Sequence, residues 1–226
     1  MIVRKPSRAA LIPAAGSGSR LGKGPKAFLK LRDRTLLERV VNSFSPHVDE
    51  VIVAVSGEMK AEAEAILGNK ALVILGGDNR QESVYSLLHA SQADLVLIHD
   101  AARPFLAASL IKEILAVSEK SGAATVARAV VDTLIHEHGE AVDRQKIKAI
   151  QTPQAFRRSL ILRAHEAAKA QGKSATDDAG LLRLLHYPVS LVEGSSWLFK
   201  ITTPTDLAMA EALAPLWDEQ PHQTLR

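Results

Sequence analysis

Five short runs of Ala, Val, Ile and Leu, separated by stretches with helical periodicity, constrain the fold of this 226-residue chain more than any other feature. The runs lie at residues 9–14, 51–55, 71–75, 95–99 and 123–127. They show almost no alternation of polar and apolar residues, which is typical of parallel strands covered on both faces. We therefore predict an α/β fold with a doubly wound, mostly parallel sheet.

The intervening segments carry their own helix signals. Thr35 and Glu38 form a capping-box pattern at the start of one helical stretch, and Gly122 is a plausible stop for another. Thr203 is expected to cap the last helix. Helices are predicted at residues 35–44, 58–67, 83–91, 109–122, 159–172, 176–186 and 202–216, with a further strand at 188–194.

The residue pattern of 129–156 differs from that of the rest of the chain. Two β-like stretches lie on either side of a His-Gly-Glu turn, and the apolar residues show no helical period. This pattern predicts a hairpin or arm that projects from the main sheet. His136 and His138 form an H-x-H pair there, but with no other obvious ligands a solvated loop is the better interpretation. Because no repeat or linker divides the chain, we expect one domain, residues 1–226, that carries this arm.

The composition excludes several classes of protein. Without cysteine the chain has no disulfide, thiolate zinc site or cysteine nucleophile. The net charge is only +3 and the basic residues are dispersed, which argues against a nucleic-acid partner. No uncharged apolar stretch approaches the ~18 residues of a membrane span, so we expect a cytoplasmic protein with no membrane partner.

The glycine-rich loop after the first run is the leading candidate site. It lacks the glycine that a dinucleotide fingerprint would need at Leu21, and Gly24 stands where a Walker A loop needs Ser or Thr. Its glycines still allow backbone N–H groups to approach phosphate oxygens, and Arg20 and Lys26 supply cationic donors. A surface turn with solvated cations is the alternative, but the position after a strand favours phosphate binding.

Two further segments follow predicted strands. In GGDNRQES, Asp78 and Ser83 could contact the polar edges of a base, although a turn capped by polar residues explains the segment equally well. Asp100 ends the fourth run and could hold a divalent cation, with Arg103 near a second anion; taken alone, Asp100 is more often a helix N-cap. Together, three such elements at the carboxyl ends of one sheet indicate a nucleoside triphosphate site with Mg²⁺.

These residues resemble a known family, the cytidylyltransferases that make 4-diphosphocytidyl-2-C-methyl-D-erythritol from CTP and 2-C-methyl-D-erythritol 4-phosphate in the non-mevalonate isoprenoid pathway. The resemblance covers nearly the whole chain in order. It is carried by PAAGSGSRLGKGPKAFL, GGDNRQESV, IHDAARPF, VVDT, QTPQAF, TDDA and VEGSSWLFKITTPTDL. It implies a Rossmann-like nucleotidyltransferase fold and a homodimer in which the arm of each subunit contributes to the partner's site.

The resemblance also implies a role for individual residues. Those that bind CTP are Ala14, Ala15, Gly16, Gly18, Gly77, Asp78 and Ser83, the last three at the cytosine. Those that act on its phosphates are Arg20, Lys26 and Lys200, while Asp100 holds Mg²⁺. Those that position the methylerythritol phosphate are Arg103 and, on the arm, Thr133, Arg144 and Thr152.

Two positions depart from the family pattern. Ala27 stands where a glutamine is expected, and the residues before Lys200 read WLF where an asparagine is often found. Neither departure removes a charged group, so the predicted reaction is unaffected. A cytidylyltransferase for another polyol phosphate, such as ribitol 5-phosphate, is the nearest alternative. A nucleotide-binding module without turnover is disfavoured, because it would not need Lys26, Asp100 and Lys200 together.

Overall fold

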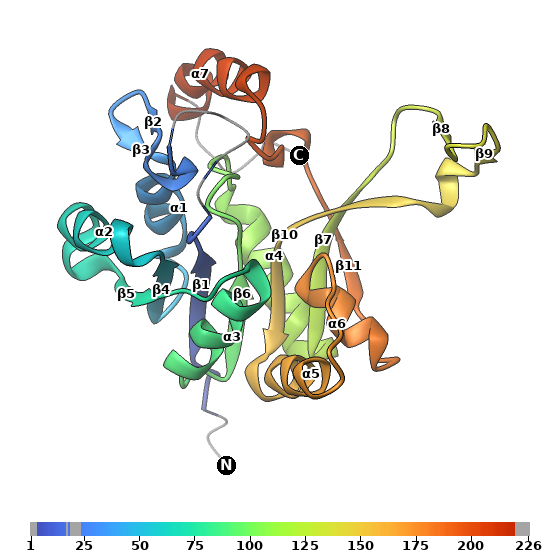
Figure 1. Ribbon diagram of the computed structural model, residues 1–226, viewed down its shortest axis with the longest axis horizontal. Helices are drawn as coiled ribbons and strands as arrows, with labels where there is room; N and C mark the ends of the chain where they lie inside the picture. Colours follow the sequence, from blue (N-terminus) through green and yellow to red (C-terminus); the bar gives the residue numbers. More distant parts are fainter. Residues whose placement is uncertain (1–3, 17, 19–23, 220–226) are drawn as a thin grey trace.

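The structure is a computed structural model that describes residues 4–16, 18 and 24–219. Its central sheet consists of β1 (Arg8–Pro13), β4 (Glu50–Val55), β5 (Leu72–Leu75), β6 (Leu95–Ile98), β7 (Ala123–Ala129), β10 (Lys148–Arg157) and β11 (Ser190–Glu193). The strand order is β11-β7-β10-β6-β1-β4-β5 (Figure 1). Only β10 runs antiparallel to its neighbours, β6 and β7. The predicted mostly parallel α/β sheet is therefore confirmed.

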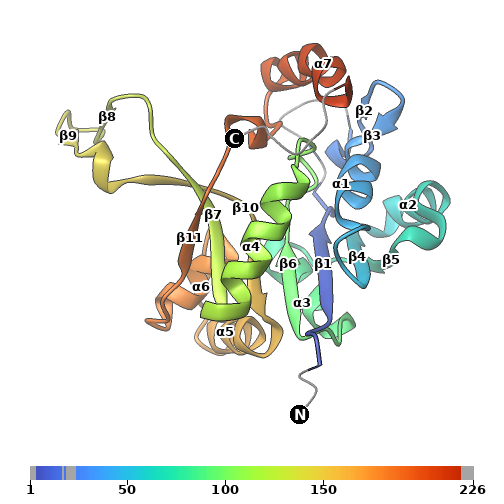
Figure 2. The ribbon, with the colours of Figure 1, turned by 180° about the vertical axis from the view of Figure 1, so that it is seen from behind.

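Helices cover both faces of this sheet. They are α1 (Leu36–Phe44), α2 (Lys60–Leu67), α3 (Arg80–Ala90), α4 (Ala108–Ser121), α5 (Arg158–Ala170), α6 (Asp178–Leu184) and α7 (Pro204–Glu219). Helices α3, α5 and α6 lie on one face (Figure 1), and α4 lies on the other (Figure 2). Successive residues of β1 enter different cores, Leu11 that of α3 and Ile12 that of α4. This explains the apolar runs of the inner strands, which bury both of their faces, whereas the edge strand β5 leaves Leu72 and Leu75 exposed.

The predicted helix signals are confirmed in detail. Thr35 accepts a hydrogen bond from the Glu38 amide at 3.1 Å, and the Glu38 carboxylate accepts one from the Thr35 amide at 2.8 Å. Gly122 ends α4 with φ of +83°, a left-handed conformation that glycine adopts without a steric penalty. The amide of Asp206 donates to the Thr203 hydroxyl at 3.2 Å at the start of α7.

Shorter elements connect the main ones. A small hairpin of β2 (Lys30–Leu31) and β3 (Arg34–Thr35) precedes α1. Five 3₁₀ turns are described: η2 (Lys26–Phe28), η3 (Gly57–Met59), η4 (Gly68–Lys70), η5 (Arg144–Lys146) and η6 (Ser196–Leu198). None of the described helices combines the length and apolar character needed to cross a membrane.

Between β7 and β10, residues 130–147 extend away from the central sheet, and we refer to them as the arm (Figure 1). Within it, β8 (Leu134–Ile135) pairs antiparallel with β9 (Ala141–Val142), and the His136 amide donates to the Glu140 carbonyl at 2.7 Å. The expected boundary at residue 156 is too late. Residues 154–156 pair with both β6 and β7, because Ala155 and Phe156 are fully buried in the main core.

Candidate active site

A cavity of about 390 Å³ opens where β1, β5 and β6 end and their following loops meet. The Lys200 segment, which follows η6, completes the wall. The lining residues are Pro13, Ala14, Ala15, Gly16, Gly18, Lys26, Ala27, Gly77, Asp78, Asn79, Arg80, Ser83, Asp100, Ala101, Ala102 and Lys200. The three sequence segments predicted to form one site therefore do converge, as expected at the carboxyl ends of strands in an open α/β sheet.

The loop after β5 is tied both to α3 and to the first loop. The Gly77 amide donates to the Ser83 hydroxyl at 3.2 Å, and that hydroxyl donates to the Asn79 carbonyl at 2.9 Å. A Cβ on Gly76 would lie 2.8 Å from the Cβ of Ala15, so the two loops touch where Gly76 has no side chain. Asn79 caps α3, which confirms the turn interpretation, while Asp78 lines the cavity.

Lys26 lies against the segment that carries Lys200. Its ammonium donates to the carbonyls of Ile201 at 3.3 Å and Thr202 at 3.2 Å. These contacts hold the Lys26 ammonium at the cavity wall, beside the segment that carries Lys200. Next to it, Ala27 is buried and belongs to the core of the α4 face, so this departure from the family pattern is accommodated by packing.

The carboxylate of Asp100 is surrounded by cations. Arg80 Nε lies 3.0 Å from Oδ1, Lys200 Nζ lies 2.7 Å from Oδ2, and Arg103 Nε lies 4.0 Å from Oδ2. Burial by itself raises the pKa of Asp100, but the charges of Arg80, Lys200 and Arg103 hold it well below its usual range. Asp100 is not a helix N-cap, since α4 begins eight residues later, after Ala107.

Thr152 and His99 fix the backbone around Asp100. The Thr152 hydroxyl accepts from the Asp100 amide at 3.1 Å and donates to Nδ1 of His99 at 3.0 Å. Nε2 of His99 then donates to the Arg103 carbonyl at 3.0 Å. Burial lowers the pKa of His99 to about 4, so the ring is neutral, as this pattern requires. The prediction that Thr152 lies on the arm is wrong: it is 5% exposed, within β10, because its hydroxyl serves this buried network.

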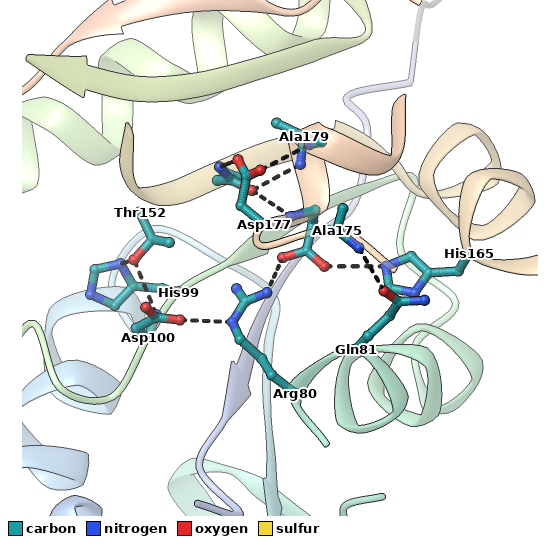
Figure 3. Close-up of polar contacts among 12 residues, drawn as sticks. Arg80, Gln81, His99, Asp100, Thr152, His165, Ala175, Asp177 and Ala179 are labelled. Carbon is teal, nitrogen blue, oxygen red and sulfur yellow. Dashed lines mark hydrogen bonds and ion pairs between the residues drawn. The ribbon is translucent and has the colours of Figure 1, made fainter. Parts of the chain in front are cut away.

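Two residues connected to this site, Arg80 and Asp178, were not predicted as site residues from the sequence. Arg80, which lies beside Asp100 in Figure 3, forms a second ion pair, at 2.8 Å, with Asp178, which also lies 3.2 Å from His165. Asp177, not Asp178, caps α6, since it accepts from the Gly180 amide. Arg80 belongs to the GGDNRQES segment. Its position beside a candidate base-binding turn is the sequence signal from which its place at the site could have been predicted.

Comparison with known proteins identifies the family. The model of the family described as 2-C-methyl-D-erythritol 4-phosphate cytidylyltransferase matches residues 8–215. The chain belongs to this family. A Deinococcus radiodurans protein with that name is 52% identical over 212 residues, covering 92% of this chain and 90% of its own length. The family predicted from the sequence motifs is therefore confirmed.

Solved structures of cytidylyltransferases share the fold. The crystal structure of 2-C-methyl-D-erythritol 4-phosphate cytidylyltransferase from Thermus thermophilus matches with a TM-score of 0.82 at 43% identity, over 94% of this chain and all of that chain. A 4-diphosphocytidyl-2C-methyl-D-erythritol synthase from Anaerococcus prevotii matches with a TM-score of 0.83 at 28% identity, over 93% of this chain and 96% of that chain.

Three further predicted site residues of this cytidylyltransferase fold, Arg103, Thr133 and Arg144, do not line the cavity. Thr133 and Arg144 lie on the arm, where the Arg144 guanidinium donates to the Val131 carbonyl. The Arg103 guanidinium lies 4.0 Å from the Asp100 carboxylate and donates to the Leu198 carbonyl. None of these is among the described residues that line the cavity. Arg20 lies outside the described residues.

The residues at the cavity fit Mg²⁺ only as an ion that is bound together with substrate phosphates. Within residues 4–16, 18 and 24–219, no group of three His, Asp or Glu side chains could hold a metal ion. The carboxylates that line the cavity are those of Asp78 and Asp100. Because Mg²⁺ in nucleotide sites is commonly held by one or two carboxylates together with phosphates and water, the site fits an ion that arrives with a triphosphate, for which Asp100 would be a protein ligand.

Proposed function

We propose that this chain transfers CMP from CTP to 2-C-methyl-D-erythritol 4-phosphate, giving 4-diphosphocytidyl-2-C-methyl-D-erythritol and pyrophosphate. The observation that carries the proposal is the convergence of Lys26, Asp100 and Lys200 on one cavity in a chain of this family. A cavity with several cations and few carboxylates suits a polyanionic nucleotide. Residues 1–226 would form a single catalytic domain built on the central sheet.

The chemistry requires two anions to meet. A phosphate oxygen of the polyol phosphate attacks the α-phosphorus of CTP, and the bond to the β-phosphate oxygen breaks, so that pyrophosphate leaves with the electron pair. The attacking phosphate is already ionised near neutral pH, and no strong general base is needed. Lys26 and Lys200 would offset the negative charge that develops at the α-phosphate, and Arg20 would bind the triphosphate.

The loops divide the nucleotide between them in this proposal. Backbone amides of Ala15, Gly16 and Gly18 would face the phosphates, and Gly77, Asp78 and Ser83 would contact the cytosine. Ala14 would line the nucleotide site without donating its amide, which is bonded to the Ala54 carbonyl at 2.7 Å. Asp100 would hold Mg²⁺, which when bound neutralises phosphate oxygens. The position of these residues around one cavity supports the assignment.

The acceptor phosphate would be bound by Arg103 together with Thr133 and Arg144 from the arm of a second subunit. Two observations support a homodimer: the arm extends away from the central sheet of its own chain (Figure 1), and its Val131 and Ile135 are 71% and 64% exposed. Exposed apolar side chains of this kind are commonly covered in an assembly. Thr152 has a different role, since it holds the loop that positions Asp100 and Arg103.

We place the reaction in the cytoplasm, because CTP and polyol phosphates carry charges that prevent them from crossing a membrane unaided. No nucleic acid is needed as a partner, since both substrates are small molecules.

The test is the release of pyrophosphate from CTP, Mg²⁺ and 2-C-methyl-D-erythritol 4-phosphate by the purified full chain, with the cytidylated product identified by mass spectrometry. Ribitol 5-phosphate is the matched control acceptor. Rapid release with the methylerythritol phosphate and little with ribitol phosphate is expected. Preference for ribitol phosphate would overturn the substrate assignment, and no release with either acceptor would overturn the proposed activity.

A further inference from the structure

Arg80 connects the cavity to a carboxylate buried behind it. The guanidinium, in the first turn of α3, lies 3.0 Å from Asp100 (Figure 3) and 2.8 Å from Asp178. Asp100 follows β6 and lines the cavity, whereas Asp178 begins α6 and is not among the described lining residues. One side chain thus joins three elements that are distant in the sequence.

The Asp178 end of this bridge is fixed. Its carboxylate is 1% exposed and lies 3.2 Å from Nε2 of His165. Its amide donates to the Gln154 side-chain oxygen at 3.1 Å, which also accepts from the Ala179 amide at 3.0 Å. Burial raises the pKa of Asp178, but Arg80 and His165 outweigh this effect and lower it, so the carboxylate is ionised. Asp178 is therefore a rigid anchor for Arg80.

The two cations nearest to the Asp100 carboxylate, Arg80 and Lys200, differ in how easily they can leave it, while Arg103 lies farther away, at 4.0 Å. Arg80 is held at both ends by carboxylates, and its side chain is 30% exposed. Lys200 contacts Asp100 through a single ammonium group on a flexible side chain that is 40% exposed. Turning Lys200 toward a substrate phosphate removes one cation from a buried carboxylate, which is costly unless another cation remains.

We propose that Arg80 is a positioning residue of the transfer reaction: anchored on Asp178, it keeps Asp100 paired and in place while Lys200 exchanges Asp100 for a substrate phosphate. The inference rests on the proposed function, because it assumes that Lys200 serves the reacting phosphate. It predicts that Asp178, which does not line the cavity, affects turnover through Arg80.

The experiment is a double-mutant cycle on the full-length enzyme, with kcat and the KM of each substrate measured for Arg80→Gln, Asp178→Asn and the double variant. We expect each single variant to lower kcat by roughly 10- to 100-fold, as for loss of an outer-shell partner of a site ligand. The double variant should be no slower than Arg80→Gln alone, because the two residues act as one unit. Arg163→Gln, on the exposed surface of α5, is the control and should keep the wild-type kcat.

Several results would overturn the inference. Wild-type kcat in Asp178→Asn, or single effects that multiply in the double variant, would show that Arg80 does not act from its anchor. A rise in the KM for CTP with unchanged kcat in Arg80→Gln would make Arg80 a direct nucleotide ligand. Circular dichroism and thermal unfolding check that each variant is folded. If Arg80→Gln fails to fold, Arg80→Lys, which keeps one charge but cannot span both carboxylates, replaces it and should also lower kcat.

Failure of this inference is distinct from failure of the proposed function. A wild-type enzyme that releases no pyrophosphate with either acceptor contradicts the proposed activity, whereas an active enzyme that is indifferent to Asp178→Asn contradicts only the role of Arg80.

Discussion

The ammonium group of Lys200 lies 2.7 Å from the carboxylate of Asp100, although 100 positions separate the two residues in the chain. The pair places a cation and an anion at the same wall of the cavity before any substrate is bound. Lys26, against the carbonyls of Ile201 and Thr202, lies beside the same segment. Much of the electrostatic arrangement needed for transfer at an α-phosphate is therefore built into the folded chain.

Replacement of Lys200 should slow the chemical step. We expect Lys200→Met to lower kcat by on the order of a hundredfold, because a methionine fills similar space but cannot stabilise charge at the α-phosphate. Steady-state pyrophosphate release at saturating CTP and polyol phosphate measures it. Lys120→Met, on the exposed end of α4, is the control. A kcat within twofold or so of the wild type would contradict the role of Lys200.

Loss of Lys26 should have a comparable effect. Lys26→Ala is expected to reduce kcat by on the order of a hundredfold or more, as for removal of a transition-state donor. The same assay applies, with Lys30→Ala, an exposed residue of β2, as the matched control. The assignment is rejected if Lys26→Ala turns over at the wild-type rate.

The arm should affect one substrate and not the other. Arg144→Ala is expected to raise the KM for the polyol phosphate by about tenfold or more, as for loss of a charge-assisted contact to phosphate, while CTP binding is retained. Calorimetric titration of CTP and steady-state kinetics with the acceptor measure the two separately. Lys146→Ala, in the same 3₁₀ turn, is the control. An equal loss of affinity for both substrates would argue against a role confined to the acceptor.

His99 should make stability depend on pH. Its pKa is about 4 in the fold against 6.5 when unperturbed, so between these values the unfolded chain binds a proton that the folded chain does not. Stability therefore falls as the pH drops below about 6.5, by about 2 kcal/mol between about pH 7.5 and about pH 5.

Urea unfolding at these two pH values, in buffer with EDTA, measures the effect. In His99→Gln this part of the pH dependence should disappear, since glutamine does not titrate, although the variant loses stability at neutral pH. An unchanged pH dependence in the variant would show that His99 does not account for it.

Local sequence patterns were sufficient for the helix caps, for the first outline of the site and for the strands of the central sheet other than β10, which was predicted as part of the arm. The Thr35–Glu38 capping box joins groups three residues apart, and Gly122 ends α4 through its own backbone conformation. Interactions of this kind depend on neighbours along the chain, so the order of residues alone is enough to predict them. Convergence of the loops after β1, β5 and β6 was predictable because parallel strands end at one edge of a sheet.

Only the tertiary structure decided which charged groups meet. Arg80 between Asp100 and Asp178, and Thr152 beneath the Asp100 loop instead of on the arm, both depend on β10 entering the sheet antiparallel between β6 and β7. The energy of an ion pair or hydrogen bond depends on distance and burial in space, not on separation in the chain. Sequence therefore determined the elements and the residues available to the site, and packing determined their partners.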